Sequence, residues 1–122
     1  MRRGEILALQ WDHIDFLRSK VLLPETKNGR SRWVPLNDKV LDILTDIEPR
    51  HRRVFPITDN AFRQAWDRLR KRADISDLTF HDLRHEAISR LFESGMCIPK
   101  VMAISGHRTA SQLFRYVQLN VD

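Results

Sequence analysis

The stretch HDLRH, from His81 to His85, opens a helical pattern that runs on to Gly95. Residues three positions apart lie on the same face of a helix, so the His81 imidazole and the Arg84 guanidinium can reach one point in space. This pairing suits a phosphate, because the guanidinium fork binds two oxygens while the histidine moves a proton or donates a further hydrogen bond. A histidine and an arginine on one face are also common in a solvated stripe, so the motif needs support from the rest of the chain.

Length and charge favour one domain, or part of one, that binds a polyanion. The 122 residues show no low-complexity segment, repeat or linker that would mark a boundary. Lysine and arginine outnumber aspartate and glutamate by 21 to 16, which favours nucleic acid or an acidic membrane as partner. No apolar run approaches membrane-spanning length, and nothing resembles a signal peptide. The single cysteine, Cys97, excludes an internal disulfide, is typical of a reducing cytosol, and is expected in the core.

The expected fold is mainly helical with one small antiparallel β-hairpin, an α+β arrangement. Residues 16–23 and 32–36 are predicted as its strands, joined through Asn28-Gly29, a dipeptide that tolerates the positive φ of a hairpin turn. Helices are predicted over residues 3–10, 38–47, 59–73, 81–95, 99–106 and 110–119, with N-caps at Asn37, at Thr58 or Asp59, and at Thr109 or Ser111.

Basic residues on the helix after Thr58 and around the hairpin are candidates for contact with a phosphate backbone. A charged helix face is more often just its solvated side, so the residues support DNA binding without requiring it. The candidates are Arg30, Arg32, Arg63, Arg68 and Lys71.

Four short motifs, in this order, resemble the boxes of the tyrosine recombinases, the phage integrase family. They are Arg2-Arg3-Gly4-Glu5 as a first arginine box, Thr26-Lys27-Asn28-Gly29 as a lysine hairpin, His81 to His85 as a His-x-x-Arg box, and Gly106-His107 with Arg115-Tyr116 as a closing box. Together the motifs cover nearly the whole chain. The resemblance implies the catalytic core of this family, acting on double-stranded DNA in site-specific recombination.

The resemblance also implies a division of the proton chemistry. Tyr116 would attack a DNA phosphodiester and form a 3′-phosphotyrosyl link, freeing a 5′ hydroxyl. Lys27 would protonate the leaving 5′ oxygen, and His81 would assist proton movement at the tyrosine.

Three further residues would bind the phosphate in the same scheme. Arg2 and Arg84 would hold the non-bridging oxygens, whose charge grows in the transition state, and His107 would add a hydrogen bond. Because one ester is exchanged for another, neither ATP nor a metal nor another cofactor is expected.

Two neighbouring side chains have other expected roles. His85 lies one turn after His81, and this spacing can bind zinc, but a zinc site needs a third protein ligand and the family resemblance explains the region better. Glu5 is expected to brace a buried arginine or a turn, since a carboxylate repels phosphate.

Family members carry helices before the first arginine box, a DNA-clamping domain before those, and often a tail after the nucleophile. Residues 1–122 are therefore expected to be a partial catalytic domain of a bacterial or phage-encoded, cytoplasmic enzyme that assembles as a tetramer. Two alternatives stay open: a non-catalytic DNA-binding fragment, and an enzyme resembling type IB topoisomerases, which relaxes supercoils by the same chemistry.

Overall fold

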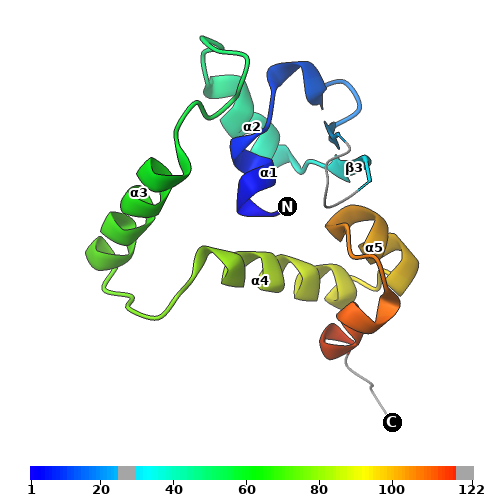
Figure 1. Ribbon diagram of the computed structural model, residues 1–122. Coiled ribbons are helices and arrows are strands. Elements are labelled where there is room, and N and C mark those ends of the chain that lie inside the picture. The colour runs from blue at the N-terminus through cyan, green and yellow to red at the C-terminus, as the bar shows by residue number, and fades with distance from the viewer. Residues whose placement is uncertain (25–29, 118–122) are drawn as a thin grey trace.

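The structure, a computed structural model, describes residues 1–24 and 30–117 (Figure 1). In chain order the elements are α1 (Arg3–Leu7), the 3₁₀ helix η1 (Trp11–His13), β1 (Ile14–Asp15), β2 (Lys20–Leu23), β3 (Arg32–Pro35), α2 (Asp38–Asp46), α3 (Asp59–Arg72), α4 (Phe80–Glu93), α5 (Ile98–Ser105) and the 3₁₀ helix η2 (Ala110–Tyr116). The predicted fold class, mainly helical with a small antiparallel sheet, is confirmed.

The sheet has three antiparallel strands in the order β1-β2-β3, with Val21 of β2 paired to Ile14 on one side and Val34 on the other. The predicted hairpin is confirmed as β2–β3, although its Asn-Gly turn lies outside the described residues. Strand β1 was not predicted, and residues 16–19 form a turn instead of continuing β2. Leu17 in that turn is 93% exposed, so it has no apolar neighbours that would hold it in a strand.

The first hydrophobic core lies against one face of the sheet. Side chains in β2 alternate between half-buried and buried positions, which is the period-two pattern of a strand with one covered face. The buried members of this sheet core are Leu9, Val21, Leu23, Val34, Leu44 and Val54. Asn37 caps α2 by accepting a hydrogen bond from the Val40 N–H at 2.9 Å, as predicted, and the helix contributes Leu44.

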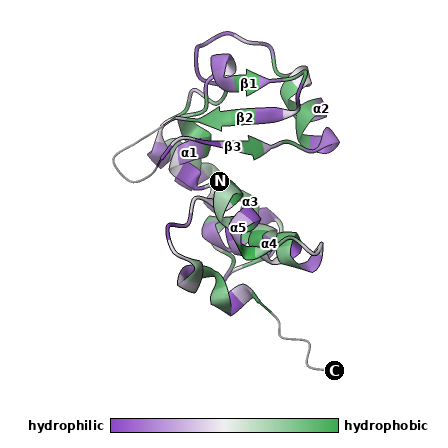
Figure 2. Ribbon diagram, turned by 90° about the vertical axis from the view of Figure 1, so that its right-hand side faces the viewer, coloured by the Kyte–Doolittle hydropathy of each residue, from purple (hydrophilic) through white to green (hydrophobic). Residues whose placement is uncertain are grey.

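A second, helical core lies where α4, α5 and η2 meet, and Figure 2 shows these helices and the sheet as separate layers. Its buried residues are Ile88, Val101 and Leu113, one from each element. Thr79 is the N-cap of α4 and forms a capping box: its hydroxyl accepts from the Asp82 N–H, and the Asp82 carboxylate accepts from the Thr79 N–H. Cys97, predicted in the core, is instead exposed at the residue before α5.

Arg32 of β3 connects the two cores. Its Nε donates to the Ile104 carbonyl of α5 at 2.8 Å, and its two terminal nitrogens donate to the Glu5 carboxylate at 2.6 and 2.9 Å. Glu5 also accepts the Arg2 backbone N–H at 2.6 Å, so the prediction that it braces an arginine and a turn is confirmed. Gly106 ends α5 at φ 80°, and a Cβ there would lie 2.8 Å from the Arg32 Cζ. This position therefore needs glycine for both conformation and space.

Helix α3 packs loosely. Phe62 and Trp66 meet Phe80 edge-on, with ring centroids 4.8 and 5.4 Å apart, but the helix has no fully buried residue. Leu69 of the same helix is exposed. Between α3 and α4 on one side and α1, α2 and the sheet on the other lies a largely apolar cleft of about 1010 Å³. No helix in the described ranges is both long and apolar enough to span a membrane.

Candidate active site

Arg84 is the buried cation around which the site is built. It lies on α4 with 7% of its surface exposed, and its Nη2 donates to the Ser105 carbonyl at 2.8 Å. Its Nη1 is buried and has no hydrogen-bond partner in the described part of the chain. Burial first, and then the charge of Arg2, lowers the pKa of Arg84 to about 10. A buried cation with an unused donor is suited to bind an anion.

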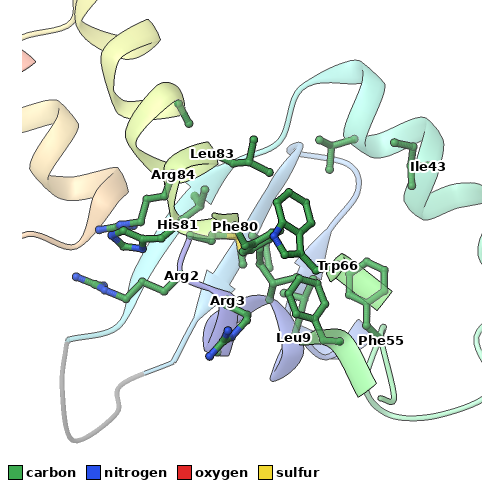
Figure 3. A pocket seen from close by; sticks show the side chains of 18 of the residues that line it. Arg2, Arg3, Leu9, Ile43, Phe55, Trp66, Phe80, His81, Leu83 and Arg84 are labelled. Atoms are coloured by element: carbon green, nitrogen blue, oxygen red, sulfur yellow. The ribbon is translucent and has the colours of Figure 1, made fainter. Parts of the chain in front are cut away.

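Arg2 and His81 lie beside Arg84 at one end of the cleft, and Figure 3 shows the nitrogen-bearing ends of all three side chains gathered together. The predicted shared face of His81 and Arg84 is therefore present on α4. Burial first, and then the charges of His85 and Arg84, lower the pKa of His81 below its ordinary 6.5. This shift favours the neutral imidazole, which can donate one N–H.

His107 follows the left-handed turn at Gly106, and the charges of Arg84 and Arg2 act on its ring. Burial first, and then Arg84 and Arg2, lower the pKa of His107 to about 4, so this ring is also neutral at pH 7. Its Nδ1 lies 2.6 Å from the Ser105 hydroxyl, which also accepts the His107 backbone N–H at 3.4 Å. A hydroxyl can donate as well as accept, so we assign the Ser105 hydroxyl proton to the bond with Nδ1, which leaves the ring proton of the neutral imidazole on Nε2. His107 therefore presents an N–H donor.

Tyr116, at the end of η2, is held by contacts on its ring and on its hydroxyl. The ring stacks on Phe92 of α4 with centroids 6.4 Å apart. The hydroxyl is hydrogen-bonded to His85 Nδ1 and accepts from Arg115 Nη2 at 2.9 Å. An ionised Tyr116 would raise the pKa of Arg84, so the two side chains lie within electrostatic range of each other.

His85 makes a contact with Tyr116 that sequence reasoning missed. The spacing from His81 suggested only a zinc ligand, whereas the structure places its Nδ1 against the tyrosine hydroxyl. No hydrogen bond joins His81 to Tyr116 within residues 1–24 and 30–117. The same described residues contain no group of three or more His, Cys, Asp or Glu side chains placed to hold a metal ion.

The remaining predicted residues fall into three groups. Lys27 lies outside the described residues, and Arg30 is exposed beside that gap. On α3, Arg63, Arg68 and Lys71 are exposed and belong to none of the ion pairs found where the chain is described. Arg32 requires a correction, because its guanidinium is bound to Glu5 and α5 inside the protein, so it braces the site and does not face DNA.

A small antiparallel sheet joined to a helical core, with two arginines, two histidines and a tyrosine close to one another, is typical of the tyrosine recombinase catalytic domains. The comparison with family models agrees. The chain belongs to the phage integrase family, whose model matches residues 1–122.

Individual relatives extend this result. The chain is 50% identical over 121 residues to a shufflon-specific DNA recombinase of Escherichia coli, covering 98% of this chain and 32% of that protein. Among solved structures, the catalytic domain of bacteriophage HP1 integrase matches with a TM-score of 0.71 and 27% identity, over 95% of this chain and 66% of that one. The Tn1549 transposon integrase in complex with a circular intermediate DNA matches with a TM-score of 0.79 and 18% identity, over 97% and 50%. The chain thus spans about a third of its curated relative and half to two thirds of these structures.

Proposed function

We propose that this chain is part of the catalytic domain of a site-specific recombinase, which cleaves and rejoins double-stranded DNA through a 3′-phosphotyrosyl link to Tyr116. The observation that carries the proposal is the buried Arg84 guanidinium, whose Nη1 has no hydrogen-bond partner among the described residues and which lies within electrostatic range of Tyr116. A DNA phosphodiester carries the negative charge and the acceptor oxygens that this guanidinium can bind.

Each step then has a group to carry it. The Tyr116 oxygen attacks phosphorus, a new O–P bond forms, and the bond from phosphorus to the 5′ oxygen breaks. Arg2, Arg84 and the Nε2–H of His107 stabilise the charge that grows on the non-bridging oxygens. The leaving oxygen takes a proton from a general acid, the role proposed for Lys27. The reverse attack by a 5′ hydroxyl rejoins the strand, so the exchange needs neither nucleotide hydrolysis nor a metal.

The net charge of +5 and the exposed cations on α3 support DNA as the partner. The Tn1549 integrase, which shares the fold, was solved with DNA. Strand exchange between two duplexes needs several nucleophiles at once, so we propose that the enzyme acts as a homotetramer.

The test uses a duplex oligonucleotide with one strand ending in a 3′-phosphate esterified to p-nitrophenol. This leaving group departs without a general acid, so the assay isolates the attack by tyrosine. We expect a burst of p-nitrophenolate together with a protein–DNA adduct that survives denaturation, and neither from Tyr116→Phe. DNA binding with no burst would support the non-catalytic alternative, and an adduct formed by Tyr116→Phe would refute the nucleophile.

A further inference from the structure

We propose that His85, and not His81, takes the proton from Tyr116, and that Arg115 holds the phenolate that results. This inference rests on the proposed function and assigns its first proton transfer. The observation behind it is the closed set of contacts among one residue of α4 and two of η2.

The contacts define the direction of the proton. Arg115 Nη2 lies 3.2 Å from His85 Nδ1 and 2.9 Å from the Tyr116 oxygen, and a guanidinium can only donate hydrogen bonds. His85 Nδ1 is therefore an acceptor, and its one lone pair faces both the Arg115 N–H and the Tyr116 hydroxyl. The tyrosine hydroxyl accepts from Arg115 and donates its own proton to His85 Nδ1. The Tyr116 oxygen, which must lose its proton before it attacks, therefore already directs that proton at the His85 ring.

The surroundings of this group of three residues keep it in place. Phe92 stacks on the tyrosine ring, and the Arg115 Cζ lies 4.9 Å from the centroid of that ring. His81 meets His85 edge-on, with ring centroids 4.6 Å apart. His81 thus limits how the His85 ring can turn while leaving the tyrosine contact to His85.

The step balances without any further reactant. The phenol O–H bond breaks and an N–H bond forms at His85 Nδ1, while the freed electron pair on the tyrosine oxygen attacks phosphorus. The titratable and charged groups facing His85 are His81 and Asp82 on α4 and Arg115 and Tyr116 on η2. The Asp82 carboxylate, close enough to feel the charge of His85, offsets the imidazolium formed in the step. On rejoining, His85 returns the proton as Tyr116 leaves.

The experiment measures single-turnover adduct formation on the p-nitrophenyl ester, where no leaving-group acid is needed. His85→Asn keeps an acceptor near the position of Nδ1 but cannot be protonated there. We expect its rate at pH 7 to fall about 100- to 10,000-fold, the usual contribution of a general base. The deficit should shrink as pH rises and solvent hydroxide removes the proton. Added imidazole should restore part of the rate in His85→Ala.

Glu86→Gln is the matched control, because Glu86 is the next residue of α4, is exposed, and bonds only Arg90 in the described residues. Circular dichroism on each variant shows that α4 still forms, and His85→Gln replaces any variant that does not fold. A His85→Asn rate equal to that of the unchanged protein overturns this inference and leaves the proposed function standing. A deficit that is the same at every pH and unrelieved by imidazole also overturns it, since His85 would then only position the tyrosine. Absence of any Tyr116-dependent adduct in the unchanged protein instead refutes the proposed function itself.

Discussion

Replacing Glu5 with glutamine tests the connection between the two cores. Glu5 and Arg32 share two hydrogen bonds, and their side chains are only 21% and 11% exposed. The Glu5→Gln side chain has the same size but no charge, so it leaves a poorly solvated cation beside Arg84 and Arg2. Breaking a buried ion pair costs about 3–5 kcal/mol, and the residual exposure here sets the expected loss of unfolding free energy at about 2–4 kcal/mol.

The measurement is urea unfolding, where the midpoint should fall with an unchanged slope, and thermal unfolding, where the midpoint should drop by roughly 10 °C. The control is Glu48→Gln, which breaks a pair with Arg50 of similar length, 2.9 Å, but with side chains 75% and 76% exposed. That loss should stay below about 1 kcal/mol. Equal losses in the two variants would refute the idea that burial makes the Arg32 pair important.

The same carboxylate gives a pH dependence with a defined sign. Burial alone would raise the pKa of Glu5, but the hydrogen bond from Arg32 and the one from the Arg2 backbone outweigh it, so its pKa lies below the ordinary 4.5. A carboxyl whose pKa is lower in the folded state stabilises the fold above its unfolded pKa. This stability is lost as the pH falls below about 4.5 towards the folded value. Glu5→Gln should remove that part of the acid sensitivity.

Three further predictions concern the turn after α5 and the anion site. Gly106→Ala should lower the free energy of unfolding, measured in urea, by more than Gly95→Ala does. Both glycines have positive φ, so each alanine strains the backbone by on the order of 1–3 kcal/mol, but only the alanine at position 106 also collides with Arg32. Arg84→Lys should lower the rate of adduct formation about 100-fold or more, since an ammonium cannot reproduce the buried fork. In NMR titrations the His107 ring should protonate near pH 4 and not near 6.5. Its pKa should rise in Arg84→Met, because the charge of Arg84 is one of the causes that lower it. Because its folded pKa is lowered, the neutral His107 contributes stability that is present above pH 6.5 and lost on acidification towards pH 4.

Local patterns predicted those parts of the fold and site that depend on neighbours in sequence. The shared face of His81 and Arg84 follows from helical spacing, and the caps of α2 and α3 follow from side chains within one turn. The contact between His85 and Tyr116 spans 31 positions and depends on how η2 packs against α4. Helical spacing carries no information on such a contact.

Charge and hydropathy were poor guides where the tertiary partner decides the outcome. In the sequence, Arg32 cannot be told apart from the exposed arginines of α3. In the structure it is bound inside the protein by Glu5 and Ile104. Strand β1 has two residues, too few to show an alternating pattern. Cys97 precedes an apolar helix and was expected inside, but its place before the first turn leaves it in solvent.

Because the two cores are separate, a substituted protein can keep its secondary structure and still lose its phosphate site. Arg2 belongs to the sheet side of the molecule through α1, whereas Arg84, His107 and Tyr116 belong to the helical side. No single element therefore contains the whole anion site, and the distance between the two arginines depends on the joint at Arg32. A substitution that loosens this joint can leave every helix and strand intact. Such a protein would have a normal circular dichroism spectrum and still fail to hold a phosphate, so loss of activity alone would not identify a catalytic residue.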